Sequence, residues 1–411
     1  MLKLFKREFY LKKIRGFYSD TGMIKVISGV RRCGKSCLMQ TIAQELVEKN
    51  NVPKENIIFL NLDAREYRNT TKADQLDLLI EKLSKNINGT KYLFIDEIQN
   101  VKDFEEVINA YREEGDYSIF ITGSNSYLLS GELATKLTGR YIEIEMFPLS
   151  FEEYEDIKKF YDKPINSNLI QEFNSYILEG GFPGAIQYEN LEDKQTYIKN
   201  IVSEIFEKDI KRRVKVKNIS VFNKVKTYII NNFGSSTSLN NIISELKKDN
   251  IIIKRETLNR YLQIISDAKI IYRCDRFDMK SKKSLTGEQK YYLSDLSFYF
   301  STNIDNRINY GPVLENVLYI YAKTRGYNIS IGKIGKTECD FIFRKMNNYA
   351  YIQAALTIMT SRETEDREYR SLENIKDNYP KYVVTLNDLL QNRNGIKHIN
   401  IVDFMKLENI F

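Results

Sequence analysis

The feature of the sequence that most constrains its fold is an alternation of short apolar strands and amphipathic helices over the first 150 residues. The strands are apolar along almost their whole length, and strands of this kind belong to parallel sheets that helices cover on both faces. The sequence therefore predicts an α/β domain that ends near Pro148. Its expected strands lie at 24–28, 57–62, 92–96, 118–123 and 141–145, and its expected helices at 35–50, 76–83, 104–111 and 127–137.

The turn after the first strand carries a glycine-rich motif. Residues 29–36 read GVRRCGKS, which fits the pattern G-x-x-x-x-G-K-[ST], and they stand between a strand and a helix as a phosphate-binding loop requires. In such a loop the backbone N–H groups and the N-terminus of the helix face phosphate oxygens. A chance match is the alternative, and the strand and helix on either side argue against it.

Side chains in and after this loop predict the chemistry. Lys35 is expected to reach the β- and γ-phosphates of ATP, and Ser36 to ligate Mg²⁺. The third strand ends in Asp96 and Glu97, about 60 residues after the loop. Following a phosphate-binding loop, this pair indicates an ATPase in which Asp96 helps to hold Mg²⁺ and Glu97 polarises the attacking water. The complete set of expected nucleotide contacts is Gly29, Val30, Arg31, Arg32, Cys33, Gly34, Lys35, Ser36 and Cys37.

Two more polar residues are candidates for catalysis. Asn125 follows the fourth strand, where its side chain could contact the γ-phosphate or the water, and the alternative is an ordinary cap or turn residue. Arg140 precedes the fifth strand. It could enter the site of a neighbouring copy as an arginine finger in a homo-oligomer, and the alternative is a surface arginine in a turn.

Rare residue types exclude several kinds of site. The one histidine, His398, excludes Ser-His-Asp and Cys-His catalysis and histidine-rich zinc sites. The four cysteines (Cys33, Cys37, Cys274 and Cys339) contain no Cys-x-x-Cys pair, and we expect reduced thiols in a cytoplasmic protein. A run of about 18 apolar residues is missing, so we expect no membrane partner. The net charge of +7 is compatible with a polyanionic partner without requiring one.

The segments GVRRCGKS, LFIDEIQ, ITGSN and GRYIEIEMFPLSFEEY together resemble the AAA+ ATPases of the prokaryotic type that carries a domain of unknown function. YILEGGFPGAI and IFEKDI extend the resemblance. It implies an AAA+ P-loop core (1–148), a helical lid (149–212), a winged helix (213–295) and a PD-(D/E)xK-nuclease-like α/β domain (296–411). It also implies that Asn125 is a nucleotide sensor and Arg140 a finger. Many such lids place a sensing arginine in a glycine-rich turn, but residues 180–184 carry none.

The middle of the chain contains a basic window and a helical pair. Residues 208–226 hold eight basic side chains and one acidic one, which suits either contact with DNA phosphates or a solvated helix face. Helices are expected at 239–248 and 255–267, followed by two strands of a wing with lysines 280, 282 and 283 at its tip. The second helix would bury Leu258, Tyr261, Leu262 and Ile265 and turn Arg255, Asn259, Arg260 and Gln263 outward. Such a module suits double-stranded DNA or a partner protein.

The C-terminal region has the outline of a nuclease with parts replaced. Glu315 lies on an expected helix and Asp340 at the start of a strand, but the final pair is Gln353 and Ala355 in place of Glu and Lys. Glutamine is a weaker ligand for a hard cation, and alanine cannot stabilise a developing charge. We therefore expect this domain to be degenerate, without metal-dependent cleavage.

Taken together, these patterns predict a Mg²⁺-dependent enzyme that binds ATP, hydrolyses it to ADP and couples its nucleotide state to double-stranded DNA or a partner protein. The alternative is a nucleotide-gated switch or DNA-binding module with negligible turnover. DNA cleavage is disfavoured by the residues at the final pair.

Overall fold

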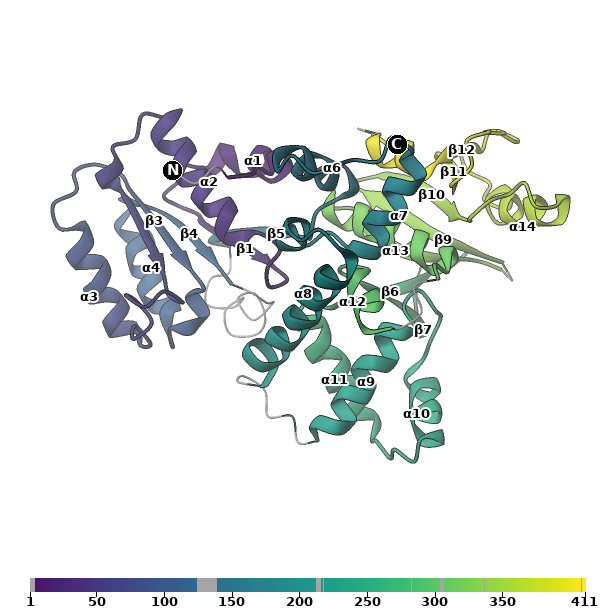
Figure 1. Cartoon of the computed structure of the whole chain (residues 1–411), viewed down its shortest axis with the longest axis horizontal. Helices are drawn as coiled ribbons and strands as arrows, with labels where there is room; N and C mark the ends of the chain where they lie inside the picture. The colour runs from purple at the N-terminus through teal and green to yellow at the C-terminus, as the bar shows by residue number, and fades with distance from the viewer. Residues whose placement is uncertain are drawn as a thin grey trace. The chain divides into compact units, whose positions relative to one another are not determined.

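The structure is a computed structural model that describes residues 4–123, 139–211, 216, 218–281, 283–303, 307–335, 337–407 and 409–411 (Figure 1). The chain divides into two compact units. The first unit holds residues 1–163 together with 182–187 and 267–269, and the second holds 164–181, 188–266 and 270–411.

The first unit is built on a parallel five-stranded sheet. Its strands pair in the order β2-β3-β4-β1-β5, which places β1 and β4 in the interior of the sheet. All five expected strands are confirmed. They are β1 (Ile24–Gly29), β2 (Ile57–Asn61), β3 (Lys91–Asp96), β4 (Tyr117–Thr122) and β5 (Tyr141–Met146).

The two faces of this sheet are packed differently. On one face, aliphatic side chains of the strands form a buried core with Leu76 and Ile80 of one helix and Ile108 of another. On the other face, Phe94 stacks on Phe120 with ring centroids 4.5 Å apart. The helices of this unit are α1 (Glu8–Ile14), α2 (Lys35–Glu48), α3 (Ala73–Ser84), α4 (Phe104–Glu114) and α6 (Phe151–Phe160). Helix α1 was not predicted, and the helix expected at 127–137 lies outside the described residues.

The second unit begins with helices. The two helices expected at 239–248 and 255–267 are confirmed, and the second of them buries the predicted apolar stripe and exposes the predicted polar face. The helices are α7 (Leu169–Glu179), α8 (Leu191–Glu204), a π-helical turn (Ile205–Lys211), α9 (Ile219–Asn231), α10 (Leu239–Lys248), α11 (Arg255–Asp267) and α12 (Ser297–Thr302).

A seven-stranded sheet follows, with the order β12-β11-β10-β9-β8-β6-β7. Its strands are β6 (Ile271–Asp278), β7 (Lys283–Leu293), β8 (Asn328–Ile334), β9 (Thr337–Lys345), β10 (Asn348–Ala354), β11 (Lys381–Thr385) and β12 (Lys397–Asn400). The helices of this part are α13 (Tyr310–Thr324), α14 (Arg362–Glu373) and α15 (Ile401–Lys406).

The position of the β6–β7 hairpin bears on the domain organisation. The two strands pair antiparallel as a wing would, but residues 276–278 of β6 also pair with residues 331–333 of β8. One sheet therefore takes strands from both sides of the boundary that we expected between residues 295 and 296. Part of the hairpin is therefore bound into this sheet, whereas the strands of a free wing pair only with each other.

Candidate functional site

The glycine-rich loop leaves β1 in a conformation that requires its two glycines. Gly29 has φ of 141°, and a Cβ atom there would lie 2.2 Å from the carbonyl oxygen of Met146. Gly34 has φ of 106° and occupies the N-cap of α2. Both φ values lie in the region that favours glycine, so the backbone of the loop by itself accounts for glycine at both positions.

The side chains of the loop divide between the interior and the surface. Lys35 is buried, and its Nζ donates hydrogen bonds to the carbonyl oxygens of Gly29 at 3.0 Å and Val30 at 3.2 Å. Ser36 is half-buried on the first turn of α2, and Arg32 and Cys37 are exposed. Burial raises the pKa of the Cys33 thiol, which suits a packing role for that side chain.

The two predicted acidic residues stand at the end of β3, where a threonine on the neighbouring strand holds the carboxylate of Asp96 and the backbone of Glu97. Strand β4 lies between β1 and β3, and it ends in the buried Thr122. The Thr122 hydroxyl donates to Oδ1 of Asp96 and accepts a hydrogen bond from the backbone N–H of Glu97 at 3.0 Å. Thr122 was given no role from the sequence, although a hydroxyl at the end of an apolar buried strand is a usable signal.

Glu97 is more tightly restrained than the sequence predicts. Its φ is 58°, which is unusual for a residue with a side chain. Its carboxylate accepts a hydrogen bond from Gln99 Nε2 and lies 3.9 Å from NH2 of Arg31. Arg31 and Glu97 are both buried, so this arginine of the loop faces the predicted catalytic carboxylate.

Arg7, which precedes α1, ties the loop to the rest of the first unit. Its guanidinium donates to the carbonyl oxygens of Cys33 at 3.0 Å and Phe147 at 2.7 Å, and it forms a two-point ion pair with Glu153. Burial opposes the charged form, but the Glu153 carboxylate together with Tyr10 and Cys33 outweighs burial, and the pKa of Arg7 is raised. Arg7 was not predicted as a site residue, because its partners lie up to 146 residues away.

Of the two other predicted catalytic residues, only Arg140 lies within the described part of the chain, and Asn125 lies outside it. Arg140 is about half exposed, and its NH1 lies 3.6 Å from the carboxylate of Glu113. Exposure leaves the arginine accessible from outside the chain, and its role as a finger stays a prediction.

In the second unit, the predicted remnants of a nuclease centre lie close together. The backbone N–H of Ala354 donates to Oδ2 of Asp340 at 2.8 Å, and Gln353 Oε1 lies 3.4 Å from the backbone nitrogen of Asp340. Glu315 is bound by Lys290 and Tyr292. No group of three or more His, Cys, Asp or Glu side chains among the described residues is arranged to hold a metal ion.

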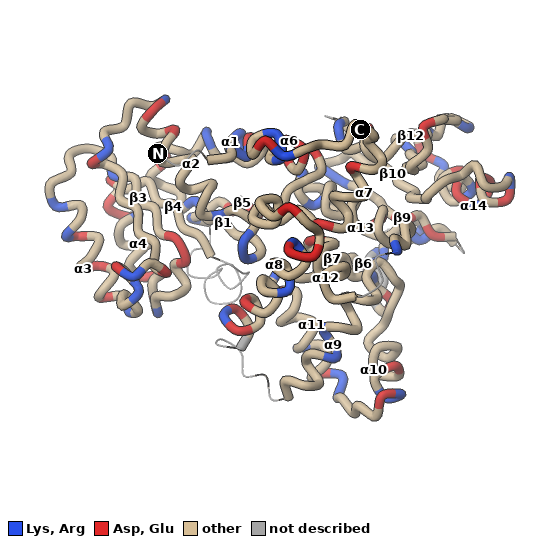
Figure 2. The backbone as a smooth tube through the Cα atoms, in the orientation of Figure 1, with Lys and Arg blue, Asp and Glu red and all other residues tan. Residues whose placement is uncertain are grey.

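The basic window at 208–226 is only partly described, and two of its lysines have partners within the protein. Lys208 pairs with Glu204 at 2.7 Å, and Lys226 lies 5.5 Å from the ring centroid of Phe206. Lys224 is exposed. Positions 212–215 and 217 lie outside the described residues. On the neighbouring helices α10 and α11, basic and acidic residues are interspersed (Figure 2).

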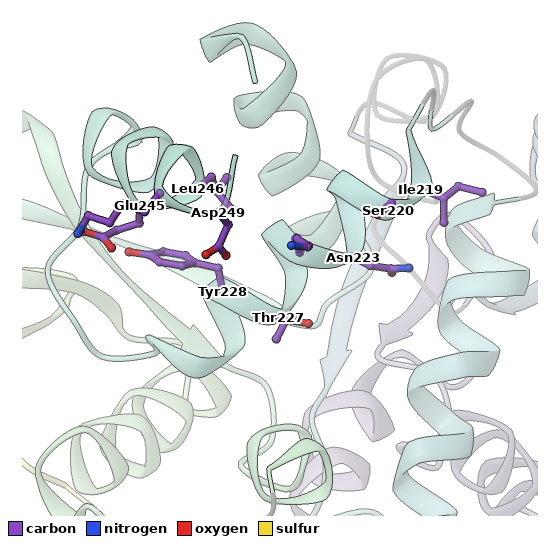
Figure 3. A pocket seen from close by; sticks show the side chains of 10 residues that line it. Ile219, Ser220, Asn223, Thr227, Tyr228, Glu245, Leu246 and Asp249 are labelled. Atoms are coloured by element: carbon purple, nitrogen blue, oxygen red, sulfur yellow. The ribbon is translucent and has the colours of Figure 1, made fainter. Parts of the chain in front are cut away.

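A groove of about 850 Å³ lies between α9 and α10 (Figure 3). Its lining includes Lys224 and Lys248 as well as Glu245 and Asp249. Lys248 is already paired with Glu245 at 2.7 Å. Because charges of both signs line the groove, it lacks the uniformly basic character of a channel that follows a nucleic-acid backbone.

Comparison with known proteins gives matches along the whole chain. Residues 21–155 match the family described as an AAA domain, and residues 170–306 match a domain of unknown function (DUF8612). An uncharacterized protein of Haemophilus influenzae is 33% identical over 404 residues, covering 98% of each chain. An uncharacterized protein of Methanocaldococcus jannaschii is 31% identical over 377 residues, covering 89% of this chain and 82% of the relative.

Solved structures give the same fold. A Walker-type ATPase of Pyrococcus abyssi superposes with a TM-score of 0.50 at 14% identity, over 72% of this chain and 95% of that one. The parallel sheet, the loop after β1 and the acidic end of β3 define the class of P-loop proteins with an AAA+ sheet. The chain belongs to the AAA+ P-loop ATPases, in one family with these two relatives, and its AAA core is followed by the domain of unknown function at 170–306. None of the helices in the described part of the chain is long and apolar enough to cross a bilayer.

Proposed function

We propose that this chain is a Mg²⁺-dependent ATPase, in which ATP binds to the loop at 29–36 and Glu97 activates the attacking water. One observation carries the proposal. The loop follows β1 and the two acidic residues end β3, so all of them stand at the carboxyl edge of one parallel sheet, where open α/β sheets bind ligands. Between these strands, Thr122 at the end of β4 holds Asp96 and Glu97 in place.

The oxygen donors at this edge of the sheet fit a hard divalent cation. The Ser36 hydroxyl and the Asp96 carboxylate are the kinds of ligand that Mg²⁺ takes, and we assign the metal contact to them. Bound there, Mg²⁺ would neutralise charge on the β- and γ-phosphates. Lys35 would then exchange its two loop carbonyls for phosphate oxygens, and the loop would also bring Cys37 next to the nucleotide.

A second candidate function, a nucleotide-gated switch, has one specific observation in its favour. The Glu97 carboxylate already has Gln99 and Arg31 as partners. Both partners lie at Oε2, so an attacking water would have to reach the other carboxylate oxygen or displace them. If that approach is slow, occupancy by ATP rather than turnover would be the output of the site.

We further propose that nucleotide state is coupled to double-stranded DNA or a partner protein through the second unit. The exposed face of α11 offers arginine, asparagine and glutamine side chains, which are the types that contact phosphates and bases from a recognition helix. A homo-oligomer, in which Arg140 enters the site of a neighbouring copy, is the arrangement that would give that exposed arginine a catalytic role.

Steady-state ATP hydrolysis by wild type and Glu97→Gln, with and without duplex DNA, tests the proposal. Glu97→Gln should retain ATP binding and lose at least about 100-fold in turnover, the usual contribution of a general base. The exposed Glu55→Gln in the same unit is the matched control and should keep wild-type turnover. Unchanged turnover in Glu97→Gln would refute the assignment.

The same assay separates the two candidate functions. Stimulation by DNA that disappears in Glu97→Gln would establish a DNA-coupled ATPase. Tight ATP binding by the wild type with slow, DNA-insensitive turnover would favour the switch and direct the search to a protein partner. Mass measured with and without ATP reports the homo-oligomer.

A further inference from the structure

The interior of the second unit contains a cluster of charged and amide side chains that the proposed ATPase does not use. We call it the Lys290 cluster. It draws one residue from each of five elements, β7, α13, β9, β10 and α14. Its members are Lys290, Glu315, Asp340, Gln353 and Glu368.

A lysine ammonium lies among the carboxylates of this cluster. Lys290 is 6% exposed, and its Nζ lies 2.8 Å from Oε2 of Glu315 and 3.7 Å from Oε1 of Glu338. Tyr292, on the same face of β7, donates to the same Glu315 oxygen at 2.7 Å. Burial alone would lower the pKa of Lys290, but Glu315 and Asp340 outweigh burial and raise that pKa. The buried lysine is therefore a cation.

The other carboxylates are neutralised or held by different partners. Burial and the nearby Glu315 raise the pKa of Asp340 well above its ordinary value, and Lys290 opposes the rise. Oδ2 of Asp340 accepts the Ala354 N–H. Glu368 pairs with Arg367 at 2.9 Å. Lys290 is thus the cation that pairs with Glu315, while Asp340 beside this pair is held by a backbone N–H.

The two hydrogen bonds of the Gln353 side chain require an amide at this position. Its Nε2 donates to Oε2 of Glu368 at 3.0 Å, and its Oε1 accepts from Ser371 Oγ at 3.1 Å. A glutamate at 353 could not donate, and it would set a second carboxylate against Glu368. Like charges at that distance disfavour ionisation of both groups, so the amide belongs to a centre that functions without a divalent ion.

We propose that the Lys290 cluster is a cation site whose occupant is the ammonium of Lys290, so that the wild-type cluster binds no metal. The ammonium is covalently attached and takes up the carboxylate oxygens that Mg²⁺ or Mn²⁺ requires. The cluster then acts as an internal ion-pair network that fixes α13 and α14 on the sheet. In this arrangement the second unit is a binding scaffold without cleavage chemistry.

The test is Mn²⁺ binding, measured by electron paramagnetic resonance on the full chain without nucleotide. Wild type and Glu315→Gln should bind the same amount of Mn²⁺. Lys290→Met, which keeps an apolar stem and removes the charge, should bind one more Mn²⁺ than wild type, and Lys290→Met with Glu315→Gln should lose it. Removing one partner of a buried pair should also lower the thermal midpoint of Lys290→Met by roughly 6–15 °C, and Mn²⁺ should restore at least half of the loss.

Three results would overturn the proposal. The first is a Mn²⁺ ion that wild type binds and Glu315→Gln loses. The second is a folded Lys290→Met variant that gains no Mn²⁺. The third is nicking of supercoiled plasmid by wild type that Asp340→Asn abolishes. If Lys290→Met is unfolded in EDTA, recovery of its circular dichroism with Mn²⁺ supports the proposal, and failure to recover counts against it.

Discussion

Replacing Arg7 with methionine should weaken ATP binding although Arg7 lies more than 20 residues before the loop. Its guanidinium holds the carbonyl oxygen of Cys33, inside the loop, and that of Phe147, just after β5. It also pairs with Glu153 through two hydrogen bonds. Methionine preserves most of the apolar stem, so the variant removes the hydrogen bonds and the charge without opening a large cavity.

The structure sets the size of the expected effect. Removing one partner of a buried ion pair costs about 3–5 kcal/mol of unfolding free energy. The Glu153 side chain is 16% exposed and also accepts the backbone N–H of Ser150 at 3.0 Å, so water and the helix cap replace part of what it loses. We therefore expect about 3 kcal/mol. Freeing the Cys33 carbonyl should weaken ATP binding on the order of tenfold, which corresponds to about 1.4 kcal/mol.

Because the chain contains no tryptophan, urea unfolding is best followed by circular dichroism, and ATP affinity by a fluorescent analogue. Lys6→Met is the matched control, since Lys6 is an exposed cation next to Arg7 and surface substitutions usually change stability by less than about 0.5 kcal/mol. Equal stabilities and equal affinities for Arg7→Met and Lys6→Met would refute the view that Arg7 anchors the loop.

Two further predictions concern pH. His398 accepts the backbone N–H of Gln391 on Nδ1 at 3.0 Å and contacts Thr385 Oγ1 through Nε2 at 2.7 Å, and burial lowers its pKa from 6.5. The contribution of neutral His398 to stability should be complete above pH 6.5 and be lost as the pH falls through the folded-state pKa. Because His398 is the only histidine, proton NMR titration of its ring reports that pKa directly, and a midpoint above 6.5 would contradict the reasoning. Lys25 donates to Ser118 Oγ at 2.7 Å inside the first sheet, and burial lowers its pKa from 10.5 to about 7. Between about pH 7 and 10.5 the unfolded chain therefore binds one more proton than the folded chain does. The free energy of unfolding should rise with pH across that window by up to about 1.4 kcal/mol per pH unit. Lys25→Met should remove this slope in urea unfolding.

The first sheet could be predicted because its strands are short apolar runs, and the three interior strands β1, β3 and β4 are buried on both faces. Their near-continuous apolar runs and the turns between them locate every strand of β1–β5 to within two residues. The β6–β7 hairpin could also be predicted as a pair of strands. Its pairing with β8 could not, because the pattern along a strand says which face is apolar but not which distant strand continues the sheet.

The candidate site was predictable where the chemistry lies in a contiguous motif, as in the loop at 29–36 and in Asp96 and Glu97. It was not predictable where function depends on contacts between distant residues. Arg7 is an ordinary basic residue near the N-terminus until its four carbonyl and carboxylate partners are known. Lys290 falls in an expected wing strand and was given no role from the sequence, although it and Tyr292 lie on one face of β7 and both are buried.

The two acidic centres of the chain contain similar residues and lead to opposite expectations, and the difference lies in where the positive charge comes from. At the end of β3, Asp96 has the uncharged Thr122 hydroxyl as a partner, and NH2 of Arg31 lies 3.9 Å from the Glu97 carboxylate. A carboxylate held by a hydroxyl keeps its charge available for Mg²⁺. In the Lys290 cluster the ammonium lies 2.8 Å from Glu315, so the charge is already matched within the protein. The same reasoning predicts that ATP turnover should require added Mg²⁺, whereas the second unit should be equally stable with Mg²⁺ and with EDTA.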